Sequence, residues 1–98
     1  MIRHIVMWRL KDFAEGNEKK ANALIMKQML EALNGKIDGL IKAEAGLNFT
    51  DGGYDVCLYS ELESKEALDY YQGHPEHVVV KEFVGKVVSD RAVCDSEI

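Results

Sequence analysis

The first segment of the chain alternates between apolar and polar residues in the pattern of a β-strand, in which side chains two apart share a face. One face of residues 2–10 is apolar apart from a single histidine and comprises Ile2, His4, Val6, Trp8 and Leu10. The opposite face has Ile5 and Met7 at its centre, between Arg3 and Arg9. The middle of this predicted strand is therefore apolar on both faces.

Apolar residues then recur at helical spacing and predict a helix from about Asn17 to Leu33, after a polar stretch. Its apolar side is a single stripe that comprises Ile25, Met26, Met29, Leu30 and Leu33. Such a stripe is typical of a helix that packs one side against a core. The pair Asn34-Gly35 ends the helix, because either residue tolerates the left-handed conformation common after the last turn.

Two further strands are predicted at 40–47 and 54–62, joined by a hairpin turn at Asp51-Gly52-Gly53. In the first of them the apolar face comprises Ile41, Ala43, Ala45 and Leu47, with Lys42 and Glu44 on the other face. The second is apolar on both faces, through Val56, Cys57, Leu58 and Tyr59.

The remaining residues predict two helices and a last strand. Ser64 is a suitable N-cap for the first helix, which carries Tyr71 on its apolar side and ends at Gly73. Pro75 suits the first position of the second helix, where its missing N–H has no partner in any case. The predicted buried stripe of that helix comprises Val79, Val80, Phe83, Val84 and Val87. Residues 89–95 form the predicted final strand.

The predicted order β-α-β-β-α-α-β is that of a ferredoxin-like α+β fold with a split second helix. In such a fold the helices cover one face of a four-stranded antiparallel sheet of strand order 4-1-3-2, so the first and third strands are central. The uncovered face would carry Ile5, Met7, Cys57 and Tyr59, and no helix is left to bury them. A second copy packed sheet against sheet is the simplest cover, so we predict a homodimer through the sheet face.

The two cysteines, Cys57 and Cys94, are predicted to be buried, reduced thiols that behave as small hydrophobic side chains. In the strand order above they flank the first strand at roughly 10 Å, which is too far for a disulfide. No C-x-x-C pair occurs, and His74 and His77 have no evident third ligand. The sequence therefore predicts neither a metal nor a cofactor.

Length and charge limit the number of domains, the possible partners and the expected location of the protein. Ninety-eight residues indicate one globular domain over 1–98. The net charge is −5, from 17 acidic and 12 basic residues, and only Lys19-Lys20 are adjacent bases, which argues against a nucleic-acid partner. Apolar runs are too short to cross a membrane, and the start lacks the pattern of a signal peptide. We therefore expect a cytoplasmic protein.

Candidate chemistry concentrates at the break between the two later helices. His77 lies in the first turn after Pro75, where the helix dipole disfavours the charged imidazole and lowers its pKa. A neutral histidine can act as a general base near pH 7. Tyr71 can donate a hydrogen bond to a developing enolate or carbonyl oxygen. His4, on the strand face assigned to the helices, can face the same pocket.

Each of these residues also has a purely structural interpretation. His74 is interpreted as a helix cap or a packing residue, and His4 more readily as a hydrogen-bonded core histidine than as a ligand contact. A histidine at a helix start, such as His77, often serves structure alone. Tyr71 can be a core residue whose hydroxyl reaches water, and Trp8 fits the core or a pocket wall.

Several motifs together resemble the stress-responsive dimeric α/β-barrel family, abbreviated Dabb, over nearly the whole chain. They are RHIVMWRL at 3–10, LNGKIDG at 33–39, YDV at 54–56, SELES at 60–64, YQGHPEHV at 71–78 and RAVCD at 91–95. Asp38 departs from the proline of many members.

The resemblance implies a homodimer with facing sheets. Some plant members bind magnesium near the turn after the first helix, but residues 35–39 offer one carboxylate, so no metal is expected.

The resemblance also implies candidate roles. A plant polyketide cyclase of the family has its catalytic histidine at the position of His77, its catalytic tyrosine at Tyr71 and a pocket histidine at His4. Three functions stay open. One is a non-catalytic, stress-related dimer whose pocket binds a small apolar ligand or nothing. Another is a proton-transfer or aldol enzyme acting on a small carbonyl compound, with His77 as base, Tyr71 as oxyanion donor and His4 as orienting partner. The third, by analogy of fold alone, is a dimeric-barrel monooxygenase.

Overall fold

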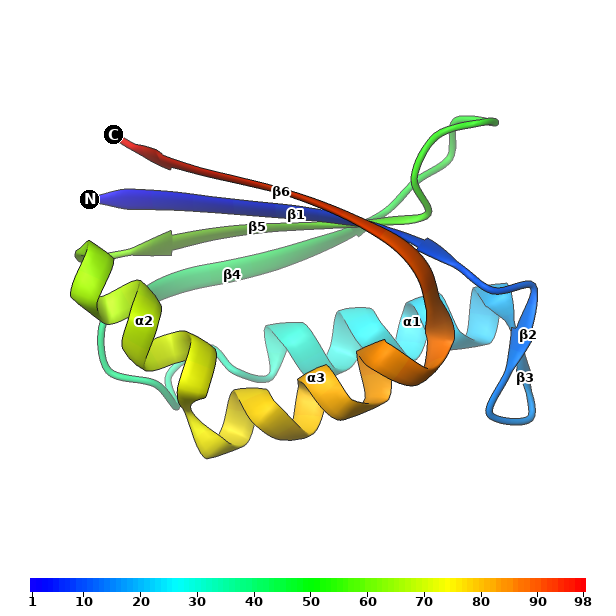
Figure 1. Cartoon of the computed structure of the whole chain (residues 1–98), viewed down its shortest axis with the longest axis horizontal. Helices are drawn as coiled ribbons and strands as arrows, with labels where there is room; N and C mark the ends of the chain where they lie inside the picture. The colour runs from blue at the N-terminus through cyan, green and yellow to red at the C-terminus, as the bar shows by residue number, and fades with distance from the viewer.

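Four antiparallel strands form one sheet, and three helices lie against one of its faces (Figure 1). The computed structural model describes all residues from 1 to 98. Its elements in chain order are β1 (Ile2–Leu10), β2 (Phe13–Ala14), β3 (Asn17–Glu18), α1 (Lys19–Glu31), β4 (Leu40–Leu47), β5 (Val56–Leu62), α2 (Lys65–Gly73), α3 (Pro75–Val87) and β6 (Val88–Glu97). The predicted ferredoxin-like α+β fold is confirmed.

The strand order of the main sheet is β4-β5-β1-β6, which is the predicted order with β1 and β5 at the centre. In the antiparallel register, Val6 of β1 lies between Leu58 of β5 and Val93 of β6. The two chain ends lie side by side in Figure 1, because β6 runs back along the whole of β1. There the Ile98 N–H donates a hydrogen bond to the Met1 carbonyl at 2.9 Å.

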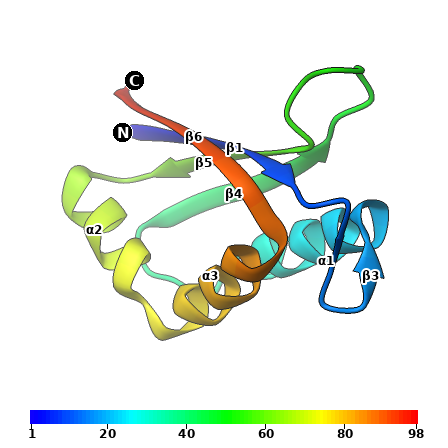
Figure 2. The same ribbon diagram turned by 45° about the vertical axis from the view of Figure 1, so that its right-hand side comes forward.

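The core lies between the helices and the inner face of the sheet. All five residues of the predicted inner face of β1 are buried: Ile2, His4, Val6, Trp8 and Leu10. Met26 and Leu30 of α1 and Val84 of α3 pack against them from the helical side. Figure 2 shows the three helices on this side and bare strands on the other. None of the helices combines the length and the apolar character that a membrane crossing requires.

The predicted helix ends of the second half are confirmed. The Ser64 hydroxyl accepts a hydrogen bond from the Ala67 N–H at 3.0 Å and caps α2. Pro75 is the first residue of α3, and the ring of His74 caps that helix by accepting from the Glu76 N–H at 3.1 Å. The two helices therefore meet at a fixed break, since each has its own cap.

The polar stretch before α1 folds into a hairpin that the sequence pattern did not indicate. Strands β2 and β3 pair around a turn in which Glu15 has φ +50° and Gly16 has φ +78°. The fully buried Asn22 of α1 fastens this hairpin, because its amide donates to the Ala14 carbonyl at 3.0 Å. The helix consequently begins at Lys19 and ends at Glu31, inside the predicted range.

Three side chains that were predicted on inner or buried faces are exposed. In β4 the pairing with β5 shifts between Leu40 and Lys42, and this bulge turns Ile41 outward, so that it is 46% exposed. Leu47, predicted on the same inner face, is also exposed at the end of the strand. In α3 the buried side comprises His77, Val80, Val84 and Val87. Val79 lies off that side and is 60% exposed.

The cysteines also contradict the prediction of burial. Both Cys57 and Cys94 are free and exposed in this chain. In the register they stand opposite Met7 and Ile5 of β1 respectively, on the face of the sheet that carries no helix. Their apolar character is therefore part of the uncovered face and not of the core.

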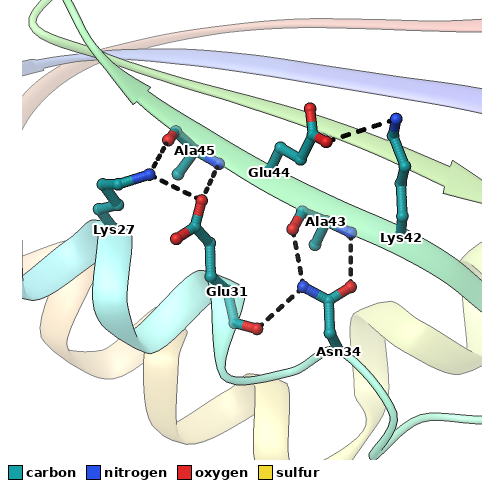
Figure 3. A network of polar contacts seen from close by, with 7 residues as sticks. All are labelled: Lys27, Glu31, Asn34, Lys42, Ala43, Glu44 and Ala45. Carbon is teal, nitrogen blue, oxygen red and sulfur yellow. Dashed lines mark hydrogen bonds and ion pairs between the residues drawn. The ribbon is translucent and has the colours of Figure 1, made fainter.

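Side chains from the end of α1 close the free edge of β4 (Figure 3). The Asn34 amide accepts from the Ala43 N–H and donates to the Ala43 carbonyl, both at 2.8 Å. The Glu31 carboxylate accepts from the Ala45 N–H at 3.0 Å, while the Lys27 ammonium donates to Glu31 at 2.8 Å and to the Ala45 carbonyl at 2.7 Å. The Lys27 contact is the main reason why the pKa of Glu31 is lowered. Polar groups that an edge strand would offer to another strand are thus satisfied within the chain.

We expect Asn34→Ala to lower the free energy of unfolding by about 1–2 kcal/mol, because both backbone groups of Ala43 lose their partner at a partly buried position. Urea unfolding followed by circular dichroism measures this change. Glu44→Ala is the matched control, since Glu44 on the same strand makes only a surface ion pair with Lys42 and should matter by less than about 0.5 kcal/mol. Equal losses in the two variants would contradict the role assigned to Asn34.

Candidate functional site

A cavity of about 320 Å³ lies between α3 and the inner face of the sheet, beside β6. Its apolar walls are Val6, Trp8, Leu30, Leu58, Val80, Val84 and Val88. Its polar lining comprises His4, Gln72, His77, Lys81 and Arg91. Small-molecule sites in proteins typically combine mostly apolar walls with a few polar groups, as this cavity does.

His77 is held in one tautomer by the backbone. It is buried in the first turn of α3, and its Nδ1 lies 3.0 Å from the Tyr71 carbonyl oxygen. A carbonyl oxygen can only accept, so Nδ1 carries the ring proton and Nε2 carries the free lone pair. Burial lowers the pKa of His77 to about 4, with a smaller opposing effect of the Tyr71 hydrogen bond and further lowering by the charge of Lys81. The imidazole is therefore neutral at physiological pH.

The ring of Tyr71 packs against the ring of His77. The two rings stack with their centroids 4.1 Å apart at an interplanar angle of 20°, and the ring of His4 meets Tyr71 edge-on at 6.2 Å. The Tyr71 hydroxyl is buried and has no hydrogen-bond partner within the chain. Burial raises the pKa of Tyr71 to about 12, so the hydroxyl keeps its proton and remains a donor.

His4 is oriented by a carboxylate from the neighbouring strand. It is buried on β1, and its Nδ1–H donates to Oδ1 of Asp95. The β1–β6 register places Asp95 directly opposite His4. This contact places a proton on Nδ1, and Nε2 of His4 has no hydrogen-bond partner within the chain.

The three predicted site residues come together from three separate elements, β1, α2 and α3. His4 and His77 line the cavity, whereas Tyr71 contacts both rings without forming part of the wall. Trp8 is a wall residue, in line with its structural interpretation. His74 lies outside the group, because its ring is engaged as the cap of α3.

Four polar residues of this region were not among the site residues predicted from sequence: Gln72, Lys81, Arg91 and Asp95. Asp95 could have been found from the predicted adjacency of the first and last strands, which only needed the register to pair it with His4. Lys81 follows His77 by four residues and so shares its side of the helix. Arg91 begins the motif RAVCD, but the motif does not indicate that this side chain lines a cavity.

Chemically, the site offers the neutral ring of His77 and the ring of His4 in the lining of a mostly apolar cavity, with the Tyr71 hydroxyl buried next to them. Such groups can accept a proton from a ligand, or donate a hydrogen bond to its oxygen. The structure contains no group of three His, Cys, Asp or Glu residues placed to hold a metal ion.

Comparison with known proteins places these features in a family. The model of the stress responsive A/B barrel domain matches residues 2–98. An uncharacterised protein of Streptomyces coelicolor is 31% identical over 96 residues, which cover 92% of this chain and 97% of that protein. A stress-response A/B barrel domain-containing protein of Arabidopsis thaliana is 32% identical over 102 residues, which cover 97% of this chain but only 36% of the plant protein.

Solved structures extend the comparison to the fold. One similar structure is a dimeric protein of unknown function with a ferredoxin-like fold from Bacteroides fragilis. It is 34% identical to this chain and has a TM-score of 0.89, and the matched region covers 99% of this chain and 95% of that protein. The hydroxynitrile lyase of Passiflora edulis has a TM-score of 0.78 at 17% identity, covering 99% of this chain and 92% of its own. At that identity the likeness concerns the fold alone.

The low pKa of His77 predicts a specific dependence of stability on pH. At pH values between 6.5, its unfolded pKa, and about 4, its folded pKa, His77 is mostly protonated in the unfolded chain and mostly neutral in the folded chain. The stabilisation is complete above pH 6.5 and is lost by about 1.4 kcal/mol per pH unit as the pH falls toward 4. His77→Asn should therefore lose less stability than the wild type between pH 7 and pH 5, by about 2 kcal/mol.

Urea unfolding at both pH values measures the difference. His74→Asn serves as the control, because asparagine also caps helices and the variant keeps His77. The burial of His77 would be contradicted if the two variants showed the same pH dependence.

Proposed function

The chain belongs to the stress-responsive A/B barrel domain family, and we propose that it works as a homodimer whose helix–sheet cavity binds a small, mostly apolar carbonyl compound. The observation that carries this proposal is the cavity of about 320 Å³ with apolar walls and the rings of His4 and His77 in its lining. Two hydrogen-bonding ring nitrogens in an otherwise apolar pocket favour a ligand with few polar atoms.

The proposed dimer follows from the face of the sheet that no helix covers. Ile5, Met7, Cys57 and Tyr59 lie on that face, where Met7 and Cys57 are exposed in a single chain. Edge pairing through β4 is disfavoured, because Asn34 and its neighbours already satisfy that edge. Solved relatives are described as dimeric. Packing of two copies face to face buries the apolar residues of both.

A second candidate function, proton transfer, is favoured by the states of His77 and Tyr71. In this reaction Nε2 of His77 takes a proton from the carbon beside a ligand carbonyl, and the electron pair of that C–H bond moves onto the oxygen as an enolate. The Tyr71 hydroxyl, which has no partner in the chain, is the proposed hydrogen-bond donor to that oxygen. Because Tyr71 is buried and does not line the cavity, this contact requires the ligand oxygen to reach past the ring of His77. His4, held by Asp95, would orient the ligand.

The low pKa of His77 limits the substrates of such a reaction. An imidazole with a pKa of about 4 is always neutral at physiological pH, but it is also a weak base. We therefore expect only compounds with acidic C–H bonds, such as 1,3-dicarbonyl compounds, to exchange protons at this site.

The dimer is tested by sedimentation velocity. The wild type should sediment with twice the mass of the chain, and Met7→Lys should sediment as a monomer, because a charge in the apolar interface would be buried without a partner. Val79→Lys places the same charge at an exposed position of α3, away from the sheet face, and should stay dimeric. A wild-type protein that is monomeric at micromolar concentration would refute the proposed dimer.

Proton transfer is tested by deuterium exchange into a methyl-substituted acetoacetate ester, followed by NMR in deuterium oxide. The wild type should accelerate exchange, whereas His77→Asn should reduce the acceleration at least about 100-fold, the usual scale of general base catalysis. Tyr71→Phe should slow exchange without loss of stability, since it removes a buried hydroxyl that has no partner. The control His74→Asn should behave as the wild type.

The outcomes separate the two functions. Binding of the ester without accelerated exchange leaves the cavity as a binding site and eliminates the proton-transfer candidate. Acceleration that survives in His77→Asn would show that another group is the base.

A further inference from the structure

The charge of the cavity differs from the charge of the chain. The whole sequence has 17 acidic and 12 basic residues and a net charge of −5. Yet the lining of the cavity includes Lys81 and Arg91 and no aspartate or glutamate. Asp95, which binds the outer nitrogen of His4, is not part of the lining. The neutral His77 adds no charge. The exposed bases Lys81 and Arg91 therefore give the opening of the cavity, its mouth, a positive charge in an acidic protein.

Neither cavity base has a carboxylate partner. Six of the other bases do form ion pairs with carboxylates, namely Arg9, Lys19, Lys27, Lys42, Lys65 and Lys86. The Lys81 ammonium instead donates to the backbone carbonyl of Gln72 at 2.7 Å. The Arg91 guanidinium makes no hydrogen bond or ion pair within the chain, since only its backbone N–H is engaged, with Asp90. Both side chains are exposed and therefore available to a ligand at the cavity mouth.

The two bases approach the cavity from different elements. Lys81 lies on α3, one helical turn after His77, and its charge contributes to the low pKa of that histidine. Arg91 lies on β6, where it pairs with the wall residue Trp8 of β1. A ligand in the cavity would thus have a cation from the helix and a cation from the sheet beside its outer end, with apolar walls further in.

We propose that the cavity selects organic acids, in which an apolar body packs on Val6, Trp8 and Val84 and a carboxylate binds Lys81 and Arg91. This inference rests on the proposed ligand-binding function and adds the chemical class of the ligand. A guanidinium presents parallel N–H donors that match the two oxygens of a carboxylate, and an ammonium adds a further charged donor.

A carboxylate suits the site better than a phosphate. Phosphate sites commonly use free backbone N–H groups of a glycine-rich loop or a helix N-terminus. At the start of α3 the Glu76 N–H is already occupied by the ring of His74. The mostly apolar walls also favour a ligand whose single charge lies at one end.

The experiment compares acids with their neutral amides, which have almost the same shape. Phenylacetate, phenylbutyrate and phenylhexanoate and the three corresponding amides are titrated into the wild-type protein by calorimetry. At least one acid should bind more tightly than its amide, and added salt should weaken only the acid. Lys81→Gln and Arg91→Gln should each weaken binding of the acid about threefold and together about tenfold, with binding of the amide unchanged.

Two further variants control for position and for site. Lys86→Gln removes one positive charge from the same helix, but Lys86 pairs with Glu15 at 3.9 Å and does not line the cavity, so binding of the acid should not change. Val84→Trp fills the cavity and should abolish binding of acid and amide alike.

The other outcomes overturn the inference in distinguishable ways. If acids and amides bind equally and depend on Val84 alone, the cavity binds ligands but does not select acids. If no ligand of the series binds, or if binding survives Val84→Trp, the cavity is not a ligand site and the proposed function fails with it. If the phosphate ester of phenylbutanol binds more tightly than phenylbutyrate, the class is phosphate monoesters and the assignment to carboxylates is wrong.

Discussion

The burial of one face of β1 against the helices is the interaction on which the rest of the structure depends. β1 is central in the sheet and pairs with β6 along its whole length and with β5 from Ile2 to Trp8. Its inner side chains, including Val6 and Trp8, are the common contact of the core and of the cavity wall. Because successive side chains of a strand alternate between faces, burying this face leaves Ile5 and Met7 on the other. The same strand thus determines the core, the cavity and the proposed dimer surface.

Specific hydrogen bonds position the polar groups at the boundaries of this core. At the β4 edge, Asn34 and Glu31 bind the backbone groups that a free edge would expose. At the cavity, the Tyr71 carbonyl orients His77 and the Asp95 carboxylate orients His4. In both places hydrogen bonds to defined partners fix the direction of a polar side chain or the position of its proton.

The proposed functions rest on polar groups that have no hydrogen-bond or ion-pair partner within the chain, or that have one remaining free position. Each histidine has one ring nitrogen engaged and one free, the Tyr71 hydroxyl has no partner, and Lys81 and Arg91 lack a carboxylate. All lie in or beside one mostly apolar cavity. A ligand in this cavity can bind the polar groups that have no partner within the chain. The rings of His4 and His77 would contact a carbonyl compound within the cavity, and the two bases would bind an acid group at its mouth.

The sequence alone determined the order of the four strands of the main sheet and the three helices, the central strands and the helix break, because alternation, helical spacing and capping residues such as Ser64 and Pro75 are local signals. It also indicated His77, Tyr71 and His4 as candidates. It could not place Ile41, because a bulge in β4 changes the face of a strand without changing the pattern of residues. Nor could it pair His4 with Asp95, because these residues are 91 positions apart and meet only through the register of β1 and β6. The tautomers, the cavity and its positive mouth were decided by tertiary packing, since each depends on which distant groups meet.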